Sequence, residues 1–470
     1  MKESLIVDNE IEFKASVPYW LLFRLSIVGF LVNCQPSEPF LTRYLIQDKD
    51  VTEGQLDDLV WPVDTYASLL FLLFMGFLAE LVSYRAVIMV GLACRQITRL
   101  LLLFSTGLMP MQLMQATYAA ATAAETVYFA YPYAVVDQEL FLISTITVRA
   151  SAHIGNAIGS GLGQILVSVF HVELRTLFFF SWGFTTLGVC AFTLLPYPKS
   201  NRLIDQSFTQ LWVKNGPSAV LSDVSSIYHD AGQRVKRSAF ASPLAIWSVW
   251  WVMGTVTSQI FINYQQNFVY VSDAHAPFGL IEVIMELGQA VIICFPLISH
   301  THGHSDSDTN SDTFSIKSSA SSVMITSAMW ASVCFFSISL WGWPPPLWVT
   351  CLASVLLSAL LGLQQAVASL SMANSAHSPD SDKEPRYAMV FSLTSLIGLI
   401  LVATGQWIAS QNNVKTLGYM LLAGAHEAIV IPLIVFFLLL DWYLVNKKAN
   451  KNYTNMYDED LKNDDVIVIE

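Results

Sequence analysis

The chain has 470 residues, of which 54% are hydrophobic and only 13% are charged, with a formal net charge of -12. Soluble domains carry roughly 25% charged residues, so this composition excludes an ordinary water-soluble protein and indicates that most of the surface faces lipid. Because the apolar runs are continuous and reach the roughly 20 residues that span a bilayer as a helix, they predict an all-α membrane protein and not a β-barrel.

Apolar runs separated by polar or proline-rich breakers predict twelve transmembrane helices. Six are expected near 19–45, 63–82, 86–107, 111–134, 141–170 and 173–195. Six more are expected near 243–270, 276–299, 322–342, 346–373, 388–409 and 416–445. These runs predict four parts: a six-helix bundle over 1–198, a central loop over 199–242, a second six-helix bundle over 243–446 and an acidic tail over 447–470.

The first predicted helix contains an interruption. Pro36 and Pro39 lie inside it, on either side of Ser37 and Glu38. Proline removes a backbone donor and bends a helix, so this span should be broken near its outer half. The freed carbonyl groups and the Glu38 carboxylate would then face a cavity rather than lipid.

Three charged residues on the side of the second and fifth predicted helices that is expected to be cytoplasmic indicate a gate. Glu80 and Arg85 lie at the end of the second helix that is expected to be cytoplasmic, where charges often hold the halves of a transporter together. Arg149 lies in the fifth helix, displaced from its midpoint toward the same side. We therefore expect structural or gating roles for these three residues.

Ionisable groups in the middle of the predicted spans are the candidates for a binding site. Such a group is costly unless it has a partner or faces a wet cavity. Glu125 lies mid-span with Tyr128 on the following turn, and Glu282 lies in an otherwise apolar eighth helix. Since aromatic faces attract a desolvated positive charge, these acids predict a cation site. The alternative is that these acids, together with Glu38, pair with Arg95 and Arg99, one turn apart on the third helix.

The distribution of basic residues predicts the orientation. The central loop is rich in lysine and arginine, whereas the loops on the opposite side keep few basic residues. By the positive-inside rule, the central loop and both termini are expected to be cytoplasmic. Two six-helix halves joined by such a loop predict the major facilitator architecture, in which the halves rock around a site near the bilayer midplane. A channel or a membrane enzyme could have as many helices, so the architecture alone does not name a function.

The sequence contains no Walker loop, no dinucleotide fingerprint and no HExxH motif. Its six cysteines are dispersed and lack the spacing of a metal site or a disulfide framework. We therefore predict no enzymatic activity, no cofactor, no metal site and no nucleic-acid partner. The expected partners are the lipid bilayer and a small-molecule substrate.

Five separated blocks carry a family signature: PSEPFLT over 36–42, AAETVYFAY over 123–131, GSGLGQILVS over 159–168, WSVWW over 247–251 and RYAMVF over 386–391. In this order the blocks resemble the solute carrier 19 family, which comprises the reduced folate carrier and the thiamine transporters. The resemblance runs over most of the chain and implies transport of a vitamin across the membrane.

Within that family, the residues resemble the thiamine-type members. Those members carry an acid in the fourth helix, as Glu125 does here, and Asn263 also resembles them. Folate-type members instead place an arginine in the tenth helix, where Gly362 stands, and a lysine in the eleventh, where Val402 stands. Folate is a dianion that acids would repel, whereas thiamine is a cation whose aminopyrimidine a carboxylate can bind. The charges and the resemblance therefore indicate the same substrate.

Two positions depart from the thiamine-type pattern. Asp64 and Arg99 each stand at a position where the resemblance to the thiamine-type members implies a tryptophan. The loss of an aromatic wall weakens the stacking half of a thiamine site. Asp64 and Arg99 could pair with each other, or they could bind a different substrate, including a phosphorylated or anionic one.

The leading hypothesis is a plasma-membrane transporter that takes up thiamine or a related organic cation by alternating access. Its pocket is expected to contain Glu38, Glu125, Tyr128, Asn263, Glu282 and Asp64. Glu125 would neutralise or hydrogen-bond the charged or aminopyrimidine part of the substrate. Tyr128 would stack on the substrate, and Asn263 would orient it.

Two alternatives stay open. The first is a transporter of folate or another organic anion, which Arg95 and Arg99 would attract. The second is a vitamin-binding sensor on the same scaffold that does not transport. The coupling ion is open as well, because desolvated carboxylates such as Glu282 and Glu286 could carry protons.

Overall fold

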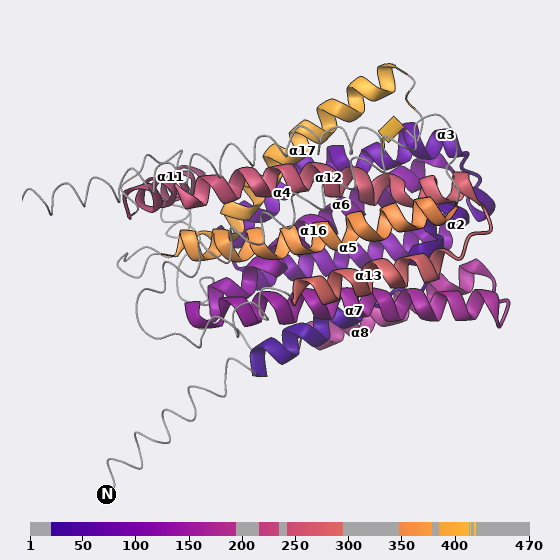
Figure 1. The fold of residues 1–470 in the computed structure, drawn as a ribbon, viewed down its shortest axis with the longest axis horizontal. Coiled ribbons are helices and arrows are strands. Elements are labelled where there is room, and N and C mark those ends of the chain that lie inside the picture. Colours follow the sequence, from indigo (N-terminus) through magenta and orange to yellow (C-terminus); the bar gives the residue numbers. More distant parts are fainter. Residues whose placement is uncertain are drawn as a thin grey trace, which may run out of the picture.

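The structure is a computed structural model that describes residues 20–193, 216–234, 242–294, 347–377, 385–412, 414 and 418–419. Throughout these ranges the regular structure is helical, without a strand. Long helices run side by side along the molecule (Figure 1). This arrangement is the one expected when every backbone polar group inside lipid must be satisfied within its own helix.

The long helices agree with the predicted runs to within a few residues at most of their ends. We call residues 199–242, predicted as the central loop, the central segment. The long helices before it are α4 (Trp61–Leu81), α5 (Tyr84–Phe104), α6 (Leu108–Val135), α7 (Phe141–Ser168) and α8 (Leu174–Thr193). After it they are α12 (Pro243–Ser272), α13 (Phe278–Ile293), α16 (Leu347–Ala376) and α17 (Tyr387–Gln411). The predicted helix over 322–342 and nearly all of the one over 416–445 lie outside the described residues.

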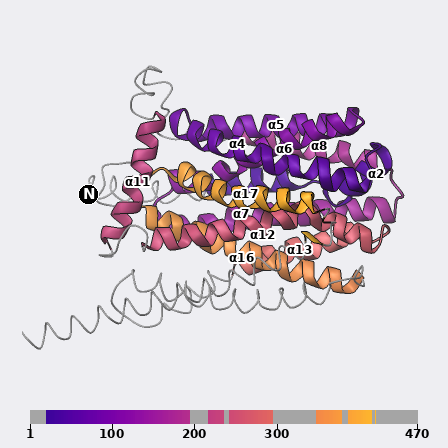
Figure 2. The same ribbon diagram turned by 90° about the horizontal axis from the view of Figure 1, so that it is seen from above.

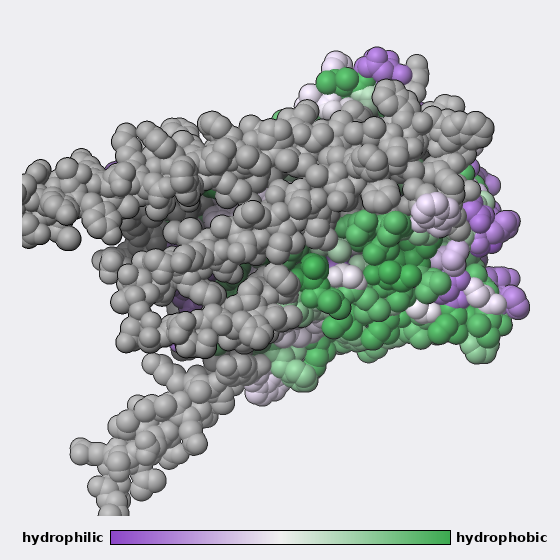
Figure 3. All heavy atoms as spheres, viewed as in Figure 1, coloured by the Kyte–Doolittle hydropathy of each residue, from purple (hydrophilic) through white to green (hydrophobic). Residues whose placement is uncertain are grey.

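Six described segments are long and apolar enough to cross a membrane: Glu53–Leu81, Tyr84–Phe104, Leu174–Thr193, Leu244–Val271, Ser354–Ala376 and Tyr387–Gln411. The exposed apolar side chains of α7 follow the helical repeat along one flank: Ile154, Ile158, Leu162 and Ile165. Figure 3 shows hydrophobic residues covering much of the coloured flank of the molecule, with hydrophilic residues gathered at the end that carries α2 and α3. These features are those of a lipid-facing surface.

The predicted interruption of the first helix is confirmed. The chain is helical over 20–33, leaves the helix over 34–37, and resumes as η1 (Glu38–Phe40) and α2 (Leu41–Asp48). Two further short elements, α3 (Glu53–Gln55) and η2 (Leu56–Val60), lead into α4. We call this end of the molecule, at the right in Figure 1, the α2 end.

Three glycines of α7, Gly155, Gly159 and Gly163, form a stripe that lets the interrupted stretch of the first helix, residues 34–40, lie directly on α7. We call residues 34–40 the broken segment. A Cβ atom added at Gly159 would collide with the backbone of Gln35, and one added at Gly163 would collide with the carbonyl oxygen of Pro36. Small residues allow this close approach between helices in a membrane. The stripe therefore fixes the position of the segment that carries Glu38.

We expect Gly163→Ala to destabilise the folded protein by about 1–3 kcal/mol, the usual cost of overpacking. The nearest atom to the new methyl group belongs to the backbone, so the broken segment would have to move away from α7. Thermal unfolding of the detergent-purified protein measures this effect. Gly183→Ala is the matched control, because a Cβ atom there meets nothing within 4 Å. Equal melting temperatures for the two variants would contradict the prediction.

The helices before and after the central segment meet along two seams. In one seam α4 packs against α17, and in the other α7 packs against α13. Gly279 of α13 lies so close to α7 that an added Cβ atom would approach the carbonyl oxygen of Ser160 to 2.6 Å. A cavity that opens to either side of a membrane requires seams of this kind, since each must be able to separate at one end.

A helix lies within the segment predicted as the central loop. This helix, α11 (Pro217–Arg234), runs crosswise to the long helices at the other end of the molecule (Figure 2), which we call the α11 end. Its apolar residues Val220, Val224, Ile227 and Ala231 recur at helical spacing and pack into the core cluster at that end. The loop prediction was therefore incomplete, because an amphipathic helix interrupts the charged stretch.

Candidate functional site

A central cavity of about 420 Å³ lies between the long helices. Its charged and titratable lining residues come from both parts of the chain: Glu38, Arg95, Arg99, Glu125, Arg149, His153, Glu282 and Glu286. Its aromatic lining residues include Trp61, Tyr118, Phe129, Trp251, Phe261 and Phe391. The cavity combines fixed charges with aromatic surfaces, which suits a charged ligand that also has flat rings.

Two arginines of α5 pair with two of the predicted site acids. Arg95 Nη2 lies 2.9 Å from Glu125 Oε2, and Arg99 Nη2 lies 3.0 Å from Glu38 Oε2. Both guanidinium groups are buried, whereas 24% of the Glu125 side chain and 30% of the Glu38 side chain remain exposed. Pairing with Arg95 and Arg99 was the alternative interpretation of these acids, and the structure contains it. The acids still border the cavity, so pairing and ligand contact are compatible.

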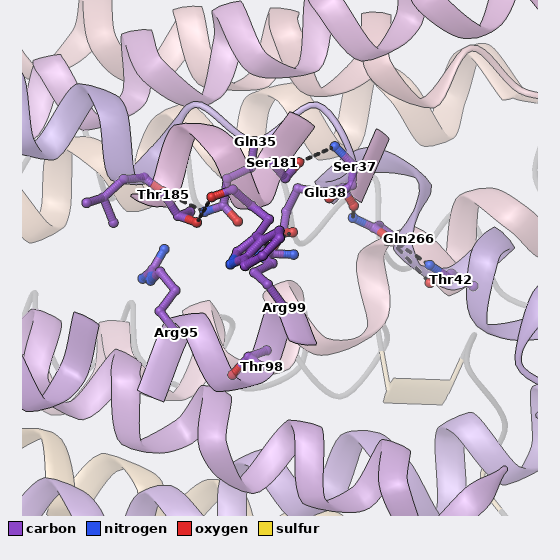
Figure 4. A network of polar contacts seen from close by, with 12 residues as sticks. Gln35, Ser37, Glu38, Thr42, Arg95, Thr98, Arg99, Ser181, Thr185 and Gln266 are labelled. Atoms are coloured by element: carbon purple, nitrogen blue, oxygen red, sulfur yellow. Dashed lines mark hydrogen bonds and ion pairs between the residues drawn. The ribbon is translucent and has the colours of Figure 1, made fainter. Parts of the chain in front are cut away.

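The broken segment is held in place by side chains from helices on both sides of the central segment. Ser181 of α8 accepts a hydrogen bond from the backbone nitrogen of Ser37 at 3.0 Å, and Gln266 of α12 donates to the carbonyl oxygen of Glu38 at 2.8 Å. Figure 4 shows these contacts, with Arg95 and Arg99 reaching toward the segment from α5. The backbone groups freed by the prolines are thus partly satisfied, and the Glu38 carboxylate is held beside Arg99.

Asp64 and Arg99 have different partners in the structure, so the possibility that they pair with each other is not the one found. The Asp64 side chain accepts a hydrogen bond from Gln259 Nε2 at 2.5 Å, and Arg99 is engaged by Glu38. Asp64 is 3% exposed and is not among the residues that line the cavity, whereas Gln259 is. Any effect of Asp64 on a ligand would therefore act through Gln259.

The side chains of α12 that face α4 and the broken segment are amides. They occupy helical positions one or two turns apart: Gln259, Asn263, Gln266 and Asn267. Asn263 Nδ2 donates to Thr65 Oγ1 at 3.3 Å, and Asn267 donates to Asp57 at 2.5 Å. Asn263 also lines the cavity. This amide stripe joins the two parts of the chain toward the α2 end.

Tyr128 lies behind the cavity wall and not in it. It is 6% exposed, and its hydroxyl donates to the carbonyl oxygen of Leu25 at 2.6 Å. The neighbouring residue Phe129 lines the cavity instead. The Arg149 guanidinium lies 4.5 Å from the centre of the Phe129 ring and 5.9 Å from that of Trp251. Phe129 and Trp251 are therefore the aromatic neighbours of a cavity charge.

Two acids of α13 border the cavity one turn apart. Glu286 Oε2 lies 2.6 Å from His153 Nδ1 of α7. Glu282 lines the cavity and has no hydrogen bond or ion pair with any other residue that the structure describes. No role was predicted for His153 from the sequence. It could have been found there as an imidazole within a predicted span, where an ionisable group is expected to have a partner.

A charge cluster joins helices from both parts of the chain at the α11 end. Arg386, immediately before α17, lies 3.0 Å from Asp223 of α11 and 3.6 Å from Glu80 of α4. Tyr84 donates to Glu80 at 2.7 Å and accepts a hydrogen bond at 3.1 Å from the backbone nitrogen of Ala388. We call Glu80, Asp223 and Arg386 the inner charge cluster. It joins three helices, and the sequence indicated only Glu80 among its members.

The other two predicted gating residues lie elsewhere. Arg85 donates to the carbonyl oxygen of Thr193 at 2.9 Å, so it joins α5 to α8 within one part of the chain. Arg149 lines the cavity, where its Nη1 lies 3.4 Å from Gln365 Oε1. Glu80 and Arg149 therefore both contact the opposite part of the chain, Glu80 through Arg386 and Arg149 through Gln365.

The sequence is similar to proteins named as thiamine and folate transporters. The chain is 32% identical to thiamine transporter 1 of Mus musculus over 286 residues, and 28% identical to folate transporter 1 of Caenorhabditis elegans over 255 residues. Each alignment covers 52% of this chain, and only 57% and 56% of the respective relative, so the chain matches little more than half the length of these proteins.

Solved structures with the same fold cover nearly the whole chain. A major facilitator superfamily transporter, FucP, in the outward conformation has a TM-score of 0.57 at 14% identity, and covers 90% of this chain and 99% of its own. The nucleoside transporter NupG has a TM-score of 0.53 at 16% identity, with 89% and 99% covered. These matches confirm the predicted all-α fold of the major facilitator type. The model of the reduced folate carrier family matches residues 19–420, and the chain therefore belongs to that family.

Proposed function

We propose that the protein is a plasma-membrane transporter that takes up thiamine or a related organic cation. Two bundles, expected over 1–198 and 243–446, would rock around the central cavity and open it to one side at a time. Both termini would lie in the cytoplasm. Family membership and relatives named as thiamine transporters support this proposal.

The charge balance of the cavity carries the choice of a cation. The described lining holds four carboxylates and three guanidinium groups. Arg95 and Arg99 are neutralised by Glu125 and Glu38, so they are poorly placed to attract an anion. Glu282 supplies the excess negative charge, because no described residue neutralises it. A monovalent organic cation would complete the balance.

The parts of thiamine fit the kinds of group that line the cavity. Glu282 would neutralise the thiazolium, and the exposed edge of Glu125 would accept a hydrogen bond from the aminopyrimidine. Phe129 and Trp251 would provide flat surfaces for the rings. Asn263 would orient the substrate by a hydrogen bond. These roles follow from residue chemistry and from the lining of the cavity.

A second candidate substrate is an organic anion such as a reduced folate. The observation that favours it is Arg149, a buried cavity base that contacts an amide and two aromatic rings but no carboxylate among the described residues. A relative named as a folate transporter is consistent with it. The two candidates differ in the charge of the substrate and are therefore easily separated.

Competition in an uptake assay decides between them. Cells that express the protein should accumulate labelled thiamine, and unlabelled thiamine should reduce this uptake at least tenfold more effectively than folate at equal concentration. Surface biotinylation provides the control for delivery to the plasma membrane. Preferential inhibition by folate would favour the anion, and saturable thiamine binding without accumulation would favour a sensor. Absence of both uptake and binding at normal surface levels would contradict the proposal.

A further inference from the structure

A buried carboxylate lies directly behind a residue of the cavity wall. Asp64 of α4 is 3% exposed, and its Oδ2 atom accepts a hydrogen bond from Gln259 Nε2 at 2.5 Å. Its Oδ1 atom is buried without a hydrogen-bond partner among the described residues. Gln259 of α12 lines the cavity, whereas Asp64 does not. Within the described part of the chain, the Asp64 carboxylate is therefore hydrogen-bonded to Gln259 alone.

This contact determines which way the amide of Gln259 is turned. An ionised carboxylate can only accept hydrogen bonds, so the amide must present its nitrogen to Asp64. Gln259 Nε2 also lies 3.5 Å from Asn263 Oδ1, and the Asn263 amide is oriented in turn by its donation to Thr65 Oγ1 at 3.3 Å. Both hydrogens of Nε2 thus have acceptors inside the protein. No described residue donates to Gln259 Oε1, so this oxygen is left for the cavity.

We propose that Asp64 is a positioning residue, which fixes Gln259 so that its amide oxygen accepts a hydrogen bond from an N–H or O–H group of the transported cation. The proposal rests on the proposed function for the transport of such a cation. A free glutamine can rotate its amide and offer either a donor or an acceptor. The fixed amide offers an acceptor only, so a ligand that presents an acceptor at this place leaves two polar groups unpaired. Asp64 would thus select the substrate without contacting it.

The competing explanation is that Asp64 only joins α4 to α12. The substitution Asp64→Asn separates the two roles, because asparagine has nearly the same shape and can still form a hydrogen bond with Gln259. It can do so either as an acceptor or as a donor, however, and it therefore allows the Gln259 amide to turn over. A residue that only joins two helices would change the uptake of all substrates in equal proportion. A residue that fixes an acceptor would change the preference among them.

Thiamine carries two groups that could donate to Gln259, the amine of its pyrimidine ring and the hydroxyl of its side chain. Two analogues each lack one of them: oxythiamine has a carbonyl group in place of the amine, and the chloroethyl analogue has chlorine in place of the hydroxyl. All three compounds are monovalent cations, so the preference among them does not depend on the net charge of the cavity. The analogue that the wild-type protein discriminates against through Gln259 identifies the donor.

Competition by unlabelled thiamine, oxythiamine and the chloroethyl analogue against uptake of labelled thiamine tests the proposal in cells that express the full-length protein. The wild type should prefer thiamine to at least one analogue, and Asp64→Asn should reduce that preference about 3- to 10-fold, the value of one neutral hydrogen bond. Asp58→Asn is the matched control, because it removes the same charge from an exposed acid outside the cavity. It should leave both preferences unchanged.

The double variant Asp64→Asn with Gln259→Glu exchanges the carboxylate and the amide. An acceptor-only group then faces the cavity again, so the wild-type preference should return. This variant keeps a hydrogen bond between the two positions, and it decides the question if the single variant does not reach the cell surface.

Equal preferences in Asp64→Asn and the wild type, no preference for thiamine over either analogue in the wild type, or a double variant at the surface without the wild-type preference would each overturn the role of Asp64 alone. Absence of thiamine uptake by the wild type at normal surface levels would contradict the proposed function as well.

Discussion

Replacing Arg386 with alanine should open the α11 end of the protein and abolish most transport. In the wild type Arg386 lies between Asp223 and the buried Glu80, whose exposed fraction is 1%. The substitution removes the Arg386 guanidinium from beside the Glu80 carboxylate, which keeps its Tyr84 contact. Breaking a buried ion pair by removing one partner costs about 3–5 kcal/mol. Only the arrangement in which the α11 end is closed is destabilised by this amount, because opening that end exposes Glu80 to water.

The expected shift favours the open arrangement more than about a hundredfold. The shift can be measured with Ser258→Cys, which introduces a cysteine in the cavity of a protein that lacks the native cysteines. The rate at which this cysteine is alkylated reports how open the cavity is. Reaction from the α11 side should accelerate in Arg386→Ala, and initial rates of thiamine uptake should fall. Arg85→Ala removes a guanidinium near the same end that contacts the Thr193 carbonyl group and the Phe192 ring, both in its own part of the chain. It should alter neither measurement.

The double variant Glu80→Gln with Arg386→Ala separates lost charge from lost packing. With the buried carboxylate replaced by a neutral amide as well, no buried charge is left at position 80, and closure should be partly restored. Alkylation that is as slow in Arg386→Ala as in the wild type would show that the inner charge cluster does not hold this end closed.

The two ends of the molecule are joined by different chemistry. The inner charge cluster consists of ion pairs, whereas the amide stripe of α12 joins the two parts of the chain toward the α2 end through uncharged amide groups, two of which, Gln259 and Asn267, donate to the carboxylates of Asp64 and Asp57. A hydrogen bond to a charged group contributes about 1.5–3 kcal/mol, whereas breaking a buried ion pair costs about 3–5 kcal/mol. We therefore expect the α2 end to open with a smaller free-energy change than the α11 end.

Local chemistry made much of the fold predictable. Pro36 and Pro39 break a helix wherever they occur in it, so the interruption could be inferred without knowledge of its neighbours. The helix α11 was missed because its segment is rich in charge, although Val220 and Val224 already show the helical spacing of its apolar face. Charge describes the exposed face of such a helix, and the apolar repeat describes the buried one.

The site was only partly predictable, because the sequence does not give the rotation of a helix about its axis. An acid within a span has few tolerable environments, and Glu38, Glu125 and Glu282 do line the cavity. Tyr128 and Phe129 are neighbours in sequence, yet a rotation of one residue places Phe129 and not Tyr128 in the wall. Pairing depends on distances between helices as well, which is why Arg99 could not be assigned to Glu38 rather than Asp64.

Glu282→Gln should lower the efficiency of thiamine uptake about 10- to 100-fold, the loss expected when a charge-assisted contact of roughly 1.5–3 kcal/mol is removed. The substitution keeps the shape of the side chain. Because Glu282 pairs with no described residue, no buried charge is left without its partner. Glu125→Gln lacks this advantage, since it would leave the buried Arg95 guanidinium uncompensated.

Initial uptake rates at several thiamine concentrations measure the effect, with Glu139→Gln as the control. Glu139 is an exposed acid outside the cavity, so its substitution removes the same charge from the protein but not from the site. The sign of the result separates the candidate substrates. A cation loses its counter-charge and should be taken up less efficiently, whereas an anion loses a repulsive neighbour and should be taken up more efficiently. Equal efficiency in Glu282→Gln and the wild type would exclude this carboxylate from the substrate site.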